Sequence, residues 1–378
     1  MPGSRAGPAG AGALRIATRG SALARWQAGE LARRLQAAHP GLEVEMVVVS
    51  TLGDRRPDVA VWEMGGQGVF VKDVQATVAA GAADVAVHSA KDLPSAAAGG
   101  GLVLGAFLAR GDPRDALVGR AFEDLPAGAA VATGSVRRRA QMAWLRPDLT
   151  FTGLRGNIGT RLARVPPGGA VVVAAAALDR LGRRAEASTV FPVEVMVPQV
   201  GQGAIAAECR AGDEATAALL AAVDDPATRV AVACERAFLA RLGGGCDLPV
   251  GAHATLGAAG GVVVDGLVAS GDGRVVLRDR ARGAGNGGGG VVVDGLVASG
   301  DGRVVLRDRA RGAGNGGAGA RGAGNGGAGA RGAGNGGAGN GGAGNRGAST
   351  LAAAEELGAG LADRLLRAGG RDLLGLAS

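Results

Sequence analysis

The sequence of 378 residues lacks tyrosine altogether and contains only three cysteines and two lysines. Three scattered cysteines cannot form a disulfide framework, so we expect a reducing compartment, namely the cytoplasm. No run of about 18 apolar residues is present, which argues against a membrane-spanning helix and a membrane partner. Residues 1–13 lack the apolar stretch of a signal peptide and are expected to form a loose tail.

Lysine is scarce because arginine supplies 39 of the 41 basic residues, and the formal net charge is +7. A basic chain can bind nucleic acid, but this one has few aromatic residues and no helix-turn-helix, zinc-finger or RNA-binding signature. We therefore expect no nucleic-acid partner. The arginine excess has two open explanations: the codon bias of a GC-rich gene, and an anionic ligand, because the planar guanidinium binds carboxylates through two donors.

Glycine, in contrast, is abundant, and its 72 residues are unevenly distributed. Residues 260–288 and 289–317 are identical over 29 positions, and each copy has two β-prone runs around a Ser-Gly-Asp-Gly turn, which predicts a hairpin. Residues 311–347 hold 19 glycines and no apolar side chain larger than alanine. Because such a segment cannot offset its chain entropy by burial, we expect a disordered insertion over about 283–347. A helix is expected from about Thr350 to Arg367.

From Leu14 to about Leu256, short apolar runs alternate with amphipathic stretches. This alternation predicts two similar α/β lobes with largely parallel sheets, and a helix near 229–242 that opens a third unit. Strands are expected at 14–18, 43–49, 84–88, 130–133 and 170–173, and helices at 21–38, 70–80, 135–145 and 156–163.

Polar residues follow the first predicted strand, at the start of the next helix. They are Thr18, Arg19 and Ser21. The free N–H groups and the positive dipole end of a helix start favour anions, so these residues are candidates for an anion site. The alternative is that Ser21 simply caps the helix.

A second group of polar residues follows the strand predicted at 84–88: His88, Ser89, Lys91 and Asp92. Open α/β sheets bind ligands at the carboxyl ends of their strands. A carboxylate beside a lysine in such a cleft can stabilise a cationic intermediate and exchange protons. The alternative is a surface turn closed by Pro94, with Asp92 as a helix cap.

Four arginines lie at or near predicted helix starts: Arg137, Arg138, Arg155 and Arg161. Cations are unfavourable at that end of the helix dipole, so their position indicates a bound polyanion. A solvated basic face is the alternative.

Glycines surround Cys246, which leaves its thiol open, whereas Cys209 and Cys234 lie in apolar runs. Cys246 is therefore a candidate nucleophile or attachment point, against the alternative of an inert thiol. The three histidines and three cysteines show no zinc-site spacing, and we expect no metal.

Taken together, the segments resemble the porphobilinogen deaminase (hydroxymethylbilane synthase) family. The resemblance covers Leu14 to about Arg282 and the last helix, with eight motifs in the family's order. They are Arg15-Ile-Ala-Thr-Arg19, Gly65-Gly-Gln-Gly-Val-Phe70, Val87-His-Ser-Ala-Lys-Asp-Leu-Pro94, Asp112-Pro-Arg-Asp115, Arg137-Arg138, Leu154-Arg-Gly-Asn157, Val200-Gly-Gln-Gly-Ala204 and Gly244-Gly-Cys-Asp-Leu-Pro-Val-Gly251.

The resemblance implies a transferase that deaminates four porphobilinogen molecules and joins them into hydroxymethylbilane, a step of haem-type tetrapyrrole biosynthesis. It implies a dipyrromethane cofactor attached covalently through Cys246 and a catalytic carboxylate at Asp92. The implied binders of cofactor and substrate carboxylates are Arg19, Arg137, Arg138, Arg155, Arg161, Arg180, Lys91, Ser21, Ser89 and Ser135. Since each pyrrole brings two carboxylates, this chemistry would account for part of the arginine excess.

The expected fold class is α/β, with two substrate-binding-protein-like lobes and a small α+β C-terminal domain. The expected domains are 14–108, completed by about 200–222; 109–199; and 223–378, which carries the duplicated hairpin and the insertion. We expect a cytoplasmic monomer. Two other classes remain open: an anion-binding protein without catalysis on the same lobes, and an RNA binder acting through residues 312–347.

Overall fold

The computed structural model describes seven ranges of the chain: 12–51, 71–95, 101–244, 247–257, 260–283, 292–299 and 342–376. The predicted tail at 1–11, the motif at 65–70, Cys246 and the glycine-rich residues 300–341 lie outside these ranges. Within them, no helix is long and apolar enough to cross a membrane.

The first lobe, called lobe 1, is built on a five-stranded sheet in the order β2-β1-β3-β10-β4. Its strands are β1 (Leu14–Arg19), β2 (Val44–Val49), β3 (Val85–Ser89), β4 (Leu102–Phe107) and β10 (Ile205–Arg210). Its helices are α1 (Ala22–Ala38), α3 (Lys72–Ala79) and α7 (Glu214–Ala221). Leu31 and Leu35 of α1 pack with Ile16 and Val85 in a core that is closed to water.

The second lobe, called lobe 2, has a five-stranded sheet in the order β7-β6-β8-β5-β9. Its strands are β5 (Asp115–Gly119), β6 (Ala130–Ala132), β7 (Thr150–Thr152), β8 (Ala170–Ala174) and β9 (Ala187–Val190). Its helices are α4 (Val136–Leu145), α5 (Ile158–Leu162) and α6 (Ala175–Arg180), followed by the short 3₁₀ turn Arg184–Glu186. Buried valines of β8 face both sides of this sheet, as a strand covered on both faces requires.

The two lobes share one strand arrangement, which confirms the prediction of two similar α/β units. In each sheet four of the five strands run in the same direction, and one strand, β10 in lobe 1 and β5 in lobe 2, runs antiparallel to both of its neighbours. The prediction of largely parallel sheets is therefore correct for strand direction except at β10 and β5. The antiparallel strands β10 and β5 are the ones by which the chain enters a lobe from its neighbour, so they arrive in the opposite direction.

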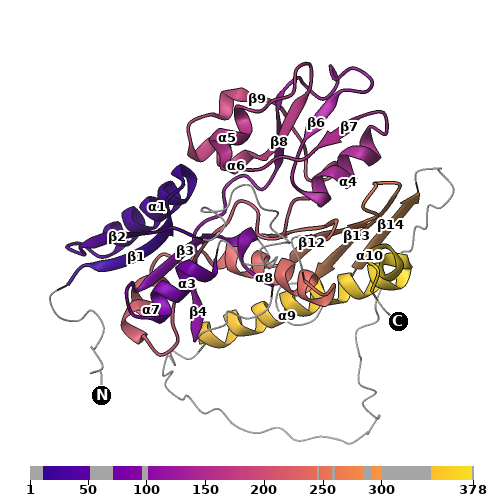
Figure 1. Ribbon diagram of the computed structural model, residues 1–378. Coiled ribbons are helices and arrows are strands. Elements are labelled where there is room, and N and C mark those ends of the chain that lie inside the picture. Colours follow the sequence, from indigo (N-terminus) through magenta and orange to yellow (C-terminus); the bar gives the residue numbers. More distant parts are fainter. Residues whose placement is uncertain are drawn as a thin grey trace, which may run out of the picture.

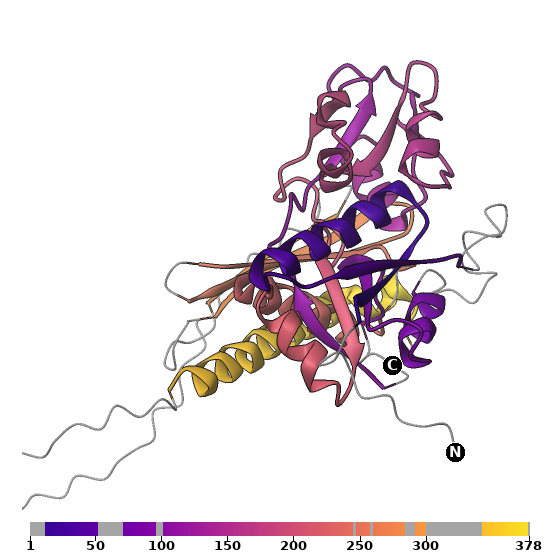
Figure 2. The ribbon, with the colours of Figure 1, turned by 90° about the vertical axis from the view of Figure 1, so that its left-hand side faces the viewer.

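Two crossover segments connect the lobes, at 108–114 and 191–204. They run side by side, because Leu108 N–H donates to the Ile205 carbonyl and Gly111 N–H donates to the Gly203 carbonyl, both at 3.0 Å. Figures 1 and 2 show lobe 2 standing above lobe 1 and the C-terminal domain.

The C-terminal domain packs a four-stranded antiparallel sheet, in the order β11-β12-β13-β14, against helices. The strands are β11 (Val250–Leu256), β12 (Val262–Ala269), β13 (Val275–Gly283) and β14 (Val292–Ser299), and the helices are α8 (Pro226–Arg241), α9 (Gly342–Leu365) and α10 (Arg371–Leu374). The buried carboxylate of Glu235 in α8 accepts hydrogen bonds from Arg110 and Gly201 of the two crossovers and from Ala254 of β11. Glu235 therefore ties this domain to both lobe connections.

The duplicated sequence contributes to this sheet through both copies. The first copy forms the predicted hairpin, β12 and β13, and the second copy adds β14 on the other side of β13. The two flanking strands have the same register: Leu277 faces Val268 on one side and Val297, the copy of Val268, on the other. β13 thus lies between two identical strands.

The last helix differs from the prediction at its start. α9 begins at Gly342, eight residues before Thr350, so residues 342–347 are helical although we expected them to be disordered. Leu357, Leu361 and Leu365 pack in the core of the C-terminal domain. Once these turns are fixed by packing, extending a helix costs far less than nucleating one.

We expect the chain without residues 289–317 to fold as the full chain does. Because the two copies are identical, this deletion gives the same sequence as removal of the first copy, and the β11-β12-β13 pairing is retained. Thermal unfolding followed by circular dichroism should show one cooperative transition, with a midpoint within about 4 °C of that of the full chain. Such a shift corresponds to a change of about 1 kcal/mol or less in the free energy of unfolding. Loss of cooperative unfolding would show that β14 is required for the core.

Candidate active site

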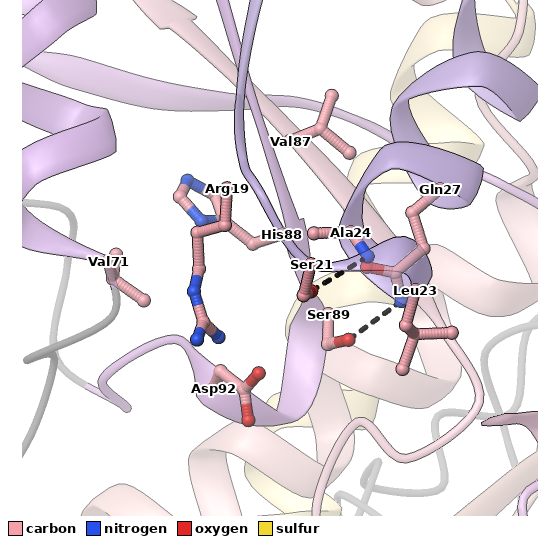
Figure 3. Close-up of a pocket in the computed structure, with 10 residues that line it drawn as sticks. All are labelled: Arg19, Ser21, Leu23, Ala24, Gln27, Val71, Val87, His88, Ser89 and Asp92. Carbon is pink, nitrogen blue, oxygen red and sulfur yellow. Dashed lines mark hydrogen bonds between the residues drawn. The ribbon is translucent and has the colours of Figure 1, made fainter. Parts of the chain in front are cut away.

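A short turn at the end of β3 presents the predicted acid. After Ser89, residues Ala90–Asp92 form one turn of 3₁₀ helix. Gln27 of α1 donates from Nε2 to the Ser89 hydroxyl at 2.7 Å, which fixes α1 against this turn. Asp92 and Arg19 line one cavity, and the Arg19 guanidinium points toward the Asp92 carboxylate (Figure 3).

The strand-to-helix segment after β1 forms the opposite wall of this cavity. Ser21 is the N-cap of α1, where its hydroxyl accepts from the Ala24 N–H at 3.2 Å, and it also lines the cavity. The capping alternative for Ser21 is thus confirmed. The cap leaves the start of α1, with its positive dipole end, facing the same space as Asp92.

Lys91 is oriented by the second crossover. Its Nζ donates to Oε1 of Gln202 at 3.3 Å. Burial, and then repulsion by Arg138, lowers the pKa of Lys91 to about 8, although Asp92 and Asp115 oppose the shift. Lys91 is therefore a cation whose charge is lost within a mildly alkaline range.

Glycine is required where the second crossover touches the 3₁₀ turn Ala90–Asp92. Gly201 has φ +72°, and a Cβ there would lie 3.0 Å from the backbone of Ala90 and Lys91. Gly203 has φ +88°, and its Cβ would lie 2.6 Å from the Gly111 carbonyl of the other crossover. These contacts explain two glycines of the 200–204 motif by close backbone approach.

The arginine pair at the start of α4 is buried and held by one carboxylate. Asp115 accepts from Arg137 Nη1 at 2.8 Å and from Arg138 Nη2 at 2.7 Å, and Gln202 Nε2 donates to it at 2.9 Å. Burial alone would raise the pKa of Asp115, but the two guanidinium charges outweigh it and hold that pKa well below its usual range. The solvated-face alternative is therefore wrong for this pair, since Arg137 is only 1% exposed.

Arg161 lies near enough to the lobe 1 residues to interact with their charges. Burial lowers the pKa of Arg161, Arg138 and Arg19 lower it further, and the Asp92 carboxylate opposes the shift. Its Nε donates to the Gly156 carbonyl at 2.8 Å, within the turn that also holds Arg155. Arg161 therefore interacts with charges of both lobes: Arg138 of lobe 2, and Arg19 and Asp92 of lobe 1.

Two further predicted residues have clear local roles. Ser135 is the N-cap of α4 and accepts from the Arg138 N–H. Arg180, the last residue of α6, donates from Nη2 to the Gly203 carbonyl at 2.6 Å. Both residues lie at the boundary between lobe 2 and the crossovers.

Sequence reasoning did not identify the polar support beneath the cavity. His88 Nε2 lies 3.1 Å from Oε2 of Glu208, both side chains are buried, and Gln75 Nε2 donates to the same carboxylate at 2.8 Å. His88 and Gln27 both line the cavity. His88 is part of the motif at 87–94 and Gln27 lies in the helix predicted at 21–38, but Glu208 and Gln75 come from elements whose sequences carry no local polar pattern.

The described residues next to Cys246 lie close to the catalytic turn. Gly244 has φ +53°, and a Cβ there would lie 2.2 Å from the hydroxyl of Ser95, three residues after Asp92. Cys209 and Cys234 are buried and unbridged, and burial raises the pKa of both thiols. Neither is suited to attack as a thiolate.

No group of three or more histidine, cysteine, aspartate or glutamate side chains that could hold a metal occurs in the part of the chain that the structure describes.

Comparison with known proteins gives the same assignment as the geometry. The family described as "Porphobilinogen deaminase, dipyromethane cofactor binding domain" matches residues 14–218, more than half of the chain, and "Porphobilinogen deaminase, C-terminal domain" matches 230–312. The chain belongs to the porphobilinogen deaminase family. The resemblance predicted from the eight motifs is thereby confirmed, and with it the expectation of an enzyme.

Curated members of the family support the assignment over most of their length. Porphobilinogen deaminase of Syntrophotalea carbinolica is 45% identical over 272 residues, which is 71% of this chain and 86% of the relative. That of Brevibacillus brevis is 43% identical over 277 residues, 72% of this chain and 89% of the relative.

Solved structures give a weaker likeness. A TRAP periplasmic solute binding protein from Pseudomonas putida F1 with bound D-glucuronate covers 56% of this chain and 77% of its own, with 10% identity and a TM-score of 0.32. The confirmed fold class, two α/β lobes with a small third domain, rests instead on the matched sheet topologies of the two lobes.

Members of the family deaminate porphobilinogen and join four molecules into hydroxymethylbilane. Such a substrate carries two carboxylates per ring, and the cleft around Asp92 is rich in guanidinium groups. The arginine excess of the sequence thus has a partly functional explanation.

We expect the KM for porphobilinogen to rise about tenfold as the pH passes from 7 to above 9. The Lys91 ammonium is charged below its pKa of about 8 and loses its proton above it, so a charge-assisted bond to a carboxylate, about 1.5–3 kcal/mol, is lost as pH rises. Steady-state kinetics across this range would measure the change.

Lys91→Arg is the matched control, because an arginine keeps its charge throughout this range. The alkaline rise in KM should be absent in this variant. The same rise in both proteins would mean that another group is responsible.

Proposed function

We propose that Asp92 is the catalytic carboxylate of this enzyme. Asp92 is the only acid among the ten described residues that line the cavity, and Arg19 at the end of β1 and Ser21 at the N-cap of α1 line the same space. A fixed carboxylate in this place stabilises the positive charge that develops on a porphobilinogen ring as ammonia leaves. It also accepts and returns the proton exchanged at the ring during coupling.

The carboxylate-binding set that we propose consists of Arg19, Arg137, Arg138, Arg155, Arg161, Arg180, Lys91, Ser21, Ser89 and Ser135. Its members are of two kinds. Arg19, Lys91 and Arg161 interact electrostatically around Asp92 and are suited to direct contact with carboxylates. Arg137, which is almost closed to water and donates from Nη1 to both Asp115 and the Val197 carbonyl, acts by holding Arg138 and the start of α4 in place.

The residues present fit a dipyrromethane cofactor. This group carries four carboxylates, and the cleft offers cations from both lobes around one acid, the donor set that such a polyanion needs. When bound, the cofactor supplies the pyrrole carbon to which each new ring is joined. Arg19 and Lys91 would hold its carboxylates from lobe 1, and Arg138 and Arg161 from lobe 2.

We propose covalent attachment of that cofactor through Cys246. Gly244, the last described residue before Cys246, packs against Ser95, three residues after Asp92. The other two thiols are buried and have raised pKa values. The contact of Gly244 with the segment that follows Asp92 is the observation that supports this attachment most directly.

We also propose that the enzyme acts as a cytoplasmic monomer with domains at 14–108 (completed by 200–222), 109–199 and 223–378. The free cysteines support a reducing compartment. The placement of Asp92, the arginines and the Gly244 contact within a single chain supports a site that needs no second copy.

The attachment is tested by the intact mass of the protein made in cells that supply porphobilinogen. We expect an added mass equal to two deaminated pyrroles, absent from Cys246→Ala and retained by the matched variant Cys209→Ala. An unmodified wild-type chain, or a modified Cys246→Ala chain, would refute attachment at this residue.

The role of Asp92 is tested with Asp92→Asn, which keeps the shape of the side chain and removes its charge. We expect the cofactor mass to be retained and turnover to fall by about 10²–10⁴-fold, the usual contribution of a positioned acid–base group. Asp148→Asn, which changes an exposed carboxylate of lobe 2, is the control and should keep full turnover. Near-normal turnover of Asp92→Asn would contradict the assignment.

A further inference from the structure

A single arginine joins lobe 2 to lobe 1 at the edge of the cleft. Arg180 ends α6 in lobe 2, and its guanidinium carbon lies 5.6 Å from the centre of the Trp26 ring on α1 in lobe 1. Helices α1 and α6 are in contact, and Figure 2 shows α1 beneath lobe 2, whereas in Figure 1 it lies below and to the left of that lobe. The interaction therefore spans the two lobes.

The same guanidinium also touches both crossovers. Its Nη2 donates to the Gly203 carbonyl at 2.6 Å, and a Cβ on Gly111 would lie 3.5 Å from that nitrogen. Arg180 thus lies at the point where α1, α6 and the two chain connections meet. A change in the spacing of the lobes would alter the Trp26 contact and the Gly203 bond together.

The contact with Trp26 uses none of the hydrogen-bond donors of the guanidinium, so these donors remain able to bind a ligand. An arginine stacks through its face, whereas its five N–H donors lie in its plane. Among the residues that the structure describes, the Gly203 carbonyl is the only acceptor of Arg180, and it takes one nitrogen. The other two nitrogens of Arg180 are open to water. Buried side-chain nitrogens without a partner occur in the described part of the chain, but those of Arg180 are not among them.

Trp26 is partly exposed, yet it contacts a cation of the other lobe. Its ring is 40% exposed, although its neighbour Gln27 is buried and bonded to Ser89. A large aromatic side chain that keeps this exposure and covers a cation of the other lobe contributes to that cation's position more than to the core of lobe 1.

We propose that Trp26 is a positioning residue for substrate binding: its indole face holds the Arg180 guanidinium so that the free edge meets a porphobilinogen carboxylate at the lobe junction. This inference rests on the proposed carboxylate-binding role of Arg180. It assigns Trp26 no contact with the reacting atoms, so its effect falls on KM and not on the chemical step.

The test compares Trp26→Phe and Trp26→Leu with the unaltered holoenzyme. Trp26→Leu removes the π face and should raise the KM for porphobilinogen about two- to fivefold, the range expected for a cation–π contact of this exposure, with kcat within about twofold. Trp26→Phe keeps a weaker π face, so its KM should lie between those of the unaltered enzyme and Trp26→Leu. Met46→Ala, which removes a side chain of equal exposure (39%) on β2, is the matched control and should leave KM unchanged.

A double-mutant cycle with Arg180→Gln decides whether Trp26 acts through Arg180. If it does, adding Trp26→Leu to Arg180→Gln produces no further rise in KM. Unchanged KM in Trp26→Leu, or an equal rise in both backgrounds, would overturn the inference; a fall in kcat with unchanged KM would overturn it too. Melting curves on all variants identify any loss of fold, and the conservative Trp26→Phe keeps the comparison available in that case.

Failure here is distinguishable from failure of the proposed function. If the proposed function is wrong, the unaltered chain lacks the cofactor mass or its dependence on Asp92. If only this inference is wrong, the unaltered chain keeps both and KM does not respond to Trp26. If Arg180→Gln alone leaves KM unchanged, the carboxylate-binding role of Arg180 fails, and the inference fails with it.

Discussion

The arrangement of the site depends on the ion pairs that the buried Asp115 carboxylate makes with Arg137 and Arg138. The Asp115 carboxylate forms ion pairs with two guanidinium groups that are themselves almost closed to water, so it offsets one of their two positive charges, and it accepts a hydrogen bond from Gln202 of the second crossover. Gln202 in turn accepts from Lys91 of the catalytic turn. A chain of contacts therefore runs from α4 in lobe 2, through one carboxylate and one amide, to the turn that carries Asp92 in lobe 1. Removal of one partner of such a buried set leaves an uncompensated charge.

This arrangement explains how two neighbouring arginines are buried side by side. Arginines that face water repel one another weakly, but buried ones require a fixed counter-charge. The chain supplies one counter-charge for Arg137 and Arg138 and leaves Arg161 and Lys91 with lowered pKa values. Those values mark cations that a carboxylate ligand stabilises, since the ligand replaces the hydration that burial removed.

The sequence allowed the residues of the site to be predicted better than their contacts. Arg19, Ser89 and Asp92 were predictable because each follows a strand, and strand ends of an α/β sheet meet at one edge. The pairing of Asp115 with Arg137 was not predictable, because it depends on β5 lying beside β8 in the middle of a mixed sheet. The missed strand β10 has the short, alanine-rich sequence Ile205–Arg210, which shows no strand periodicity. Its burial between β3 and β4 comes from topology alone.

The same limit applied to the support of the cavity. Glu208 and Gln75 are separated by 133 residues in sequence and meet only because α3 packs across β10. The helix start at Gly342 was missed for the opposite reason, since a glycine-rich composition concealed the continuation of a packed helix. In both cases tertiary packing outweighed local composition.

The placement of β13 between two identical strands has a consequence for how this domain can change. The two partner strands come from identical sequences and have the same register. They differ in connection length, five residues before β13 against eight after it, which is about 0.4 kcal/mol in loop closure, and in the pairing with β11 that β12 makes. A substitution in either copy would break this equivalence for the first time. One strand could then keep the sheet intact while the other accumulates substitutions. The repeat therefore allows sequence divergence without changes in the core of the C-terminal domain.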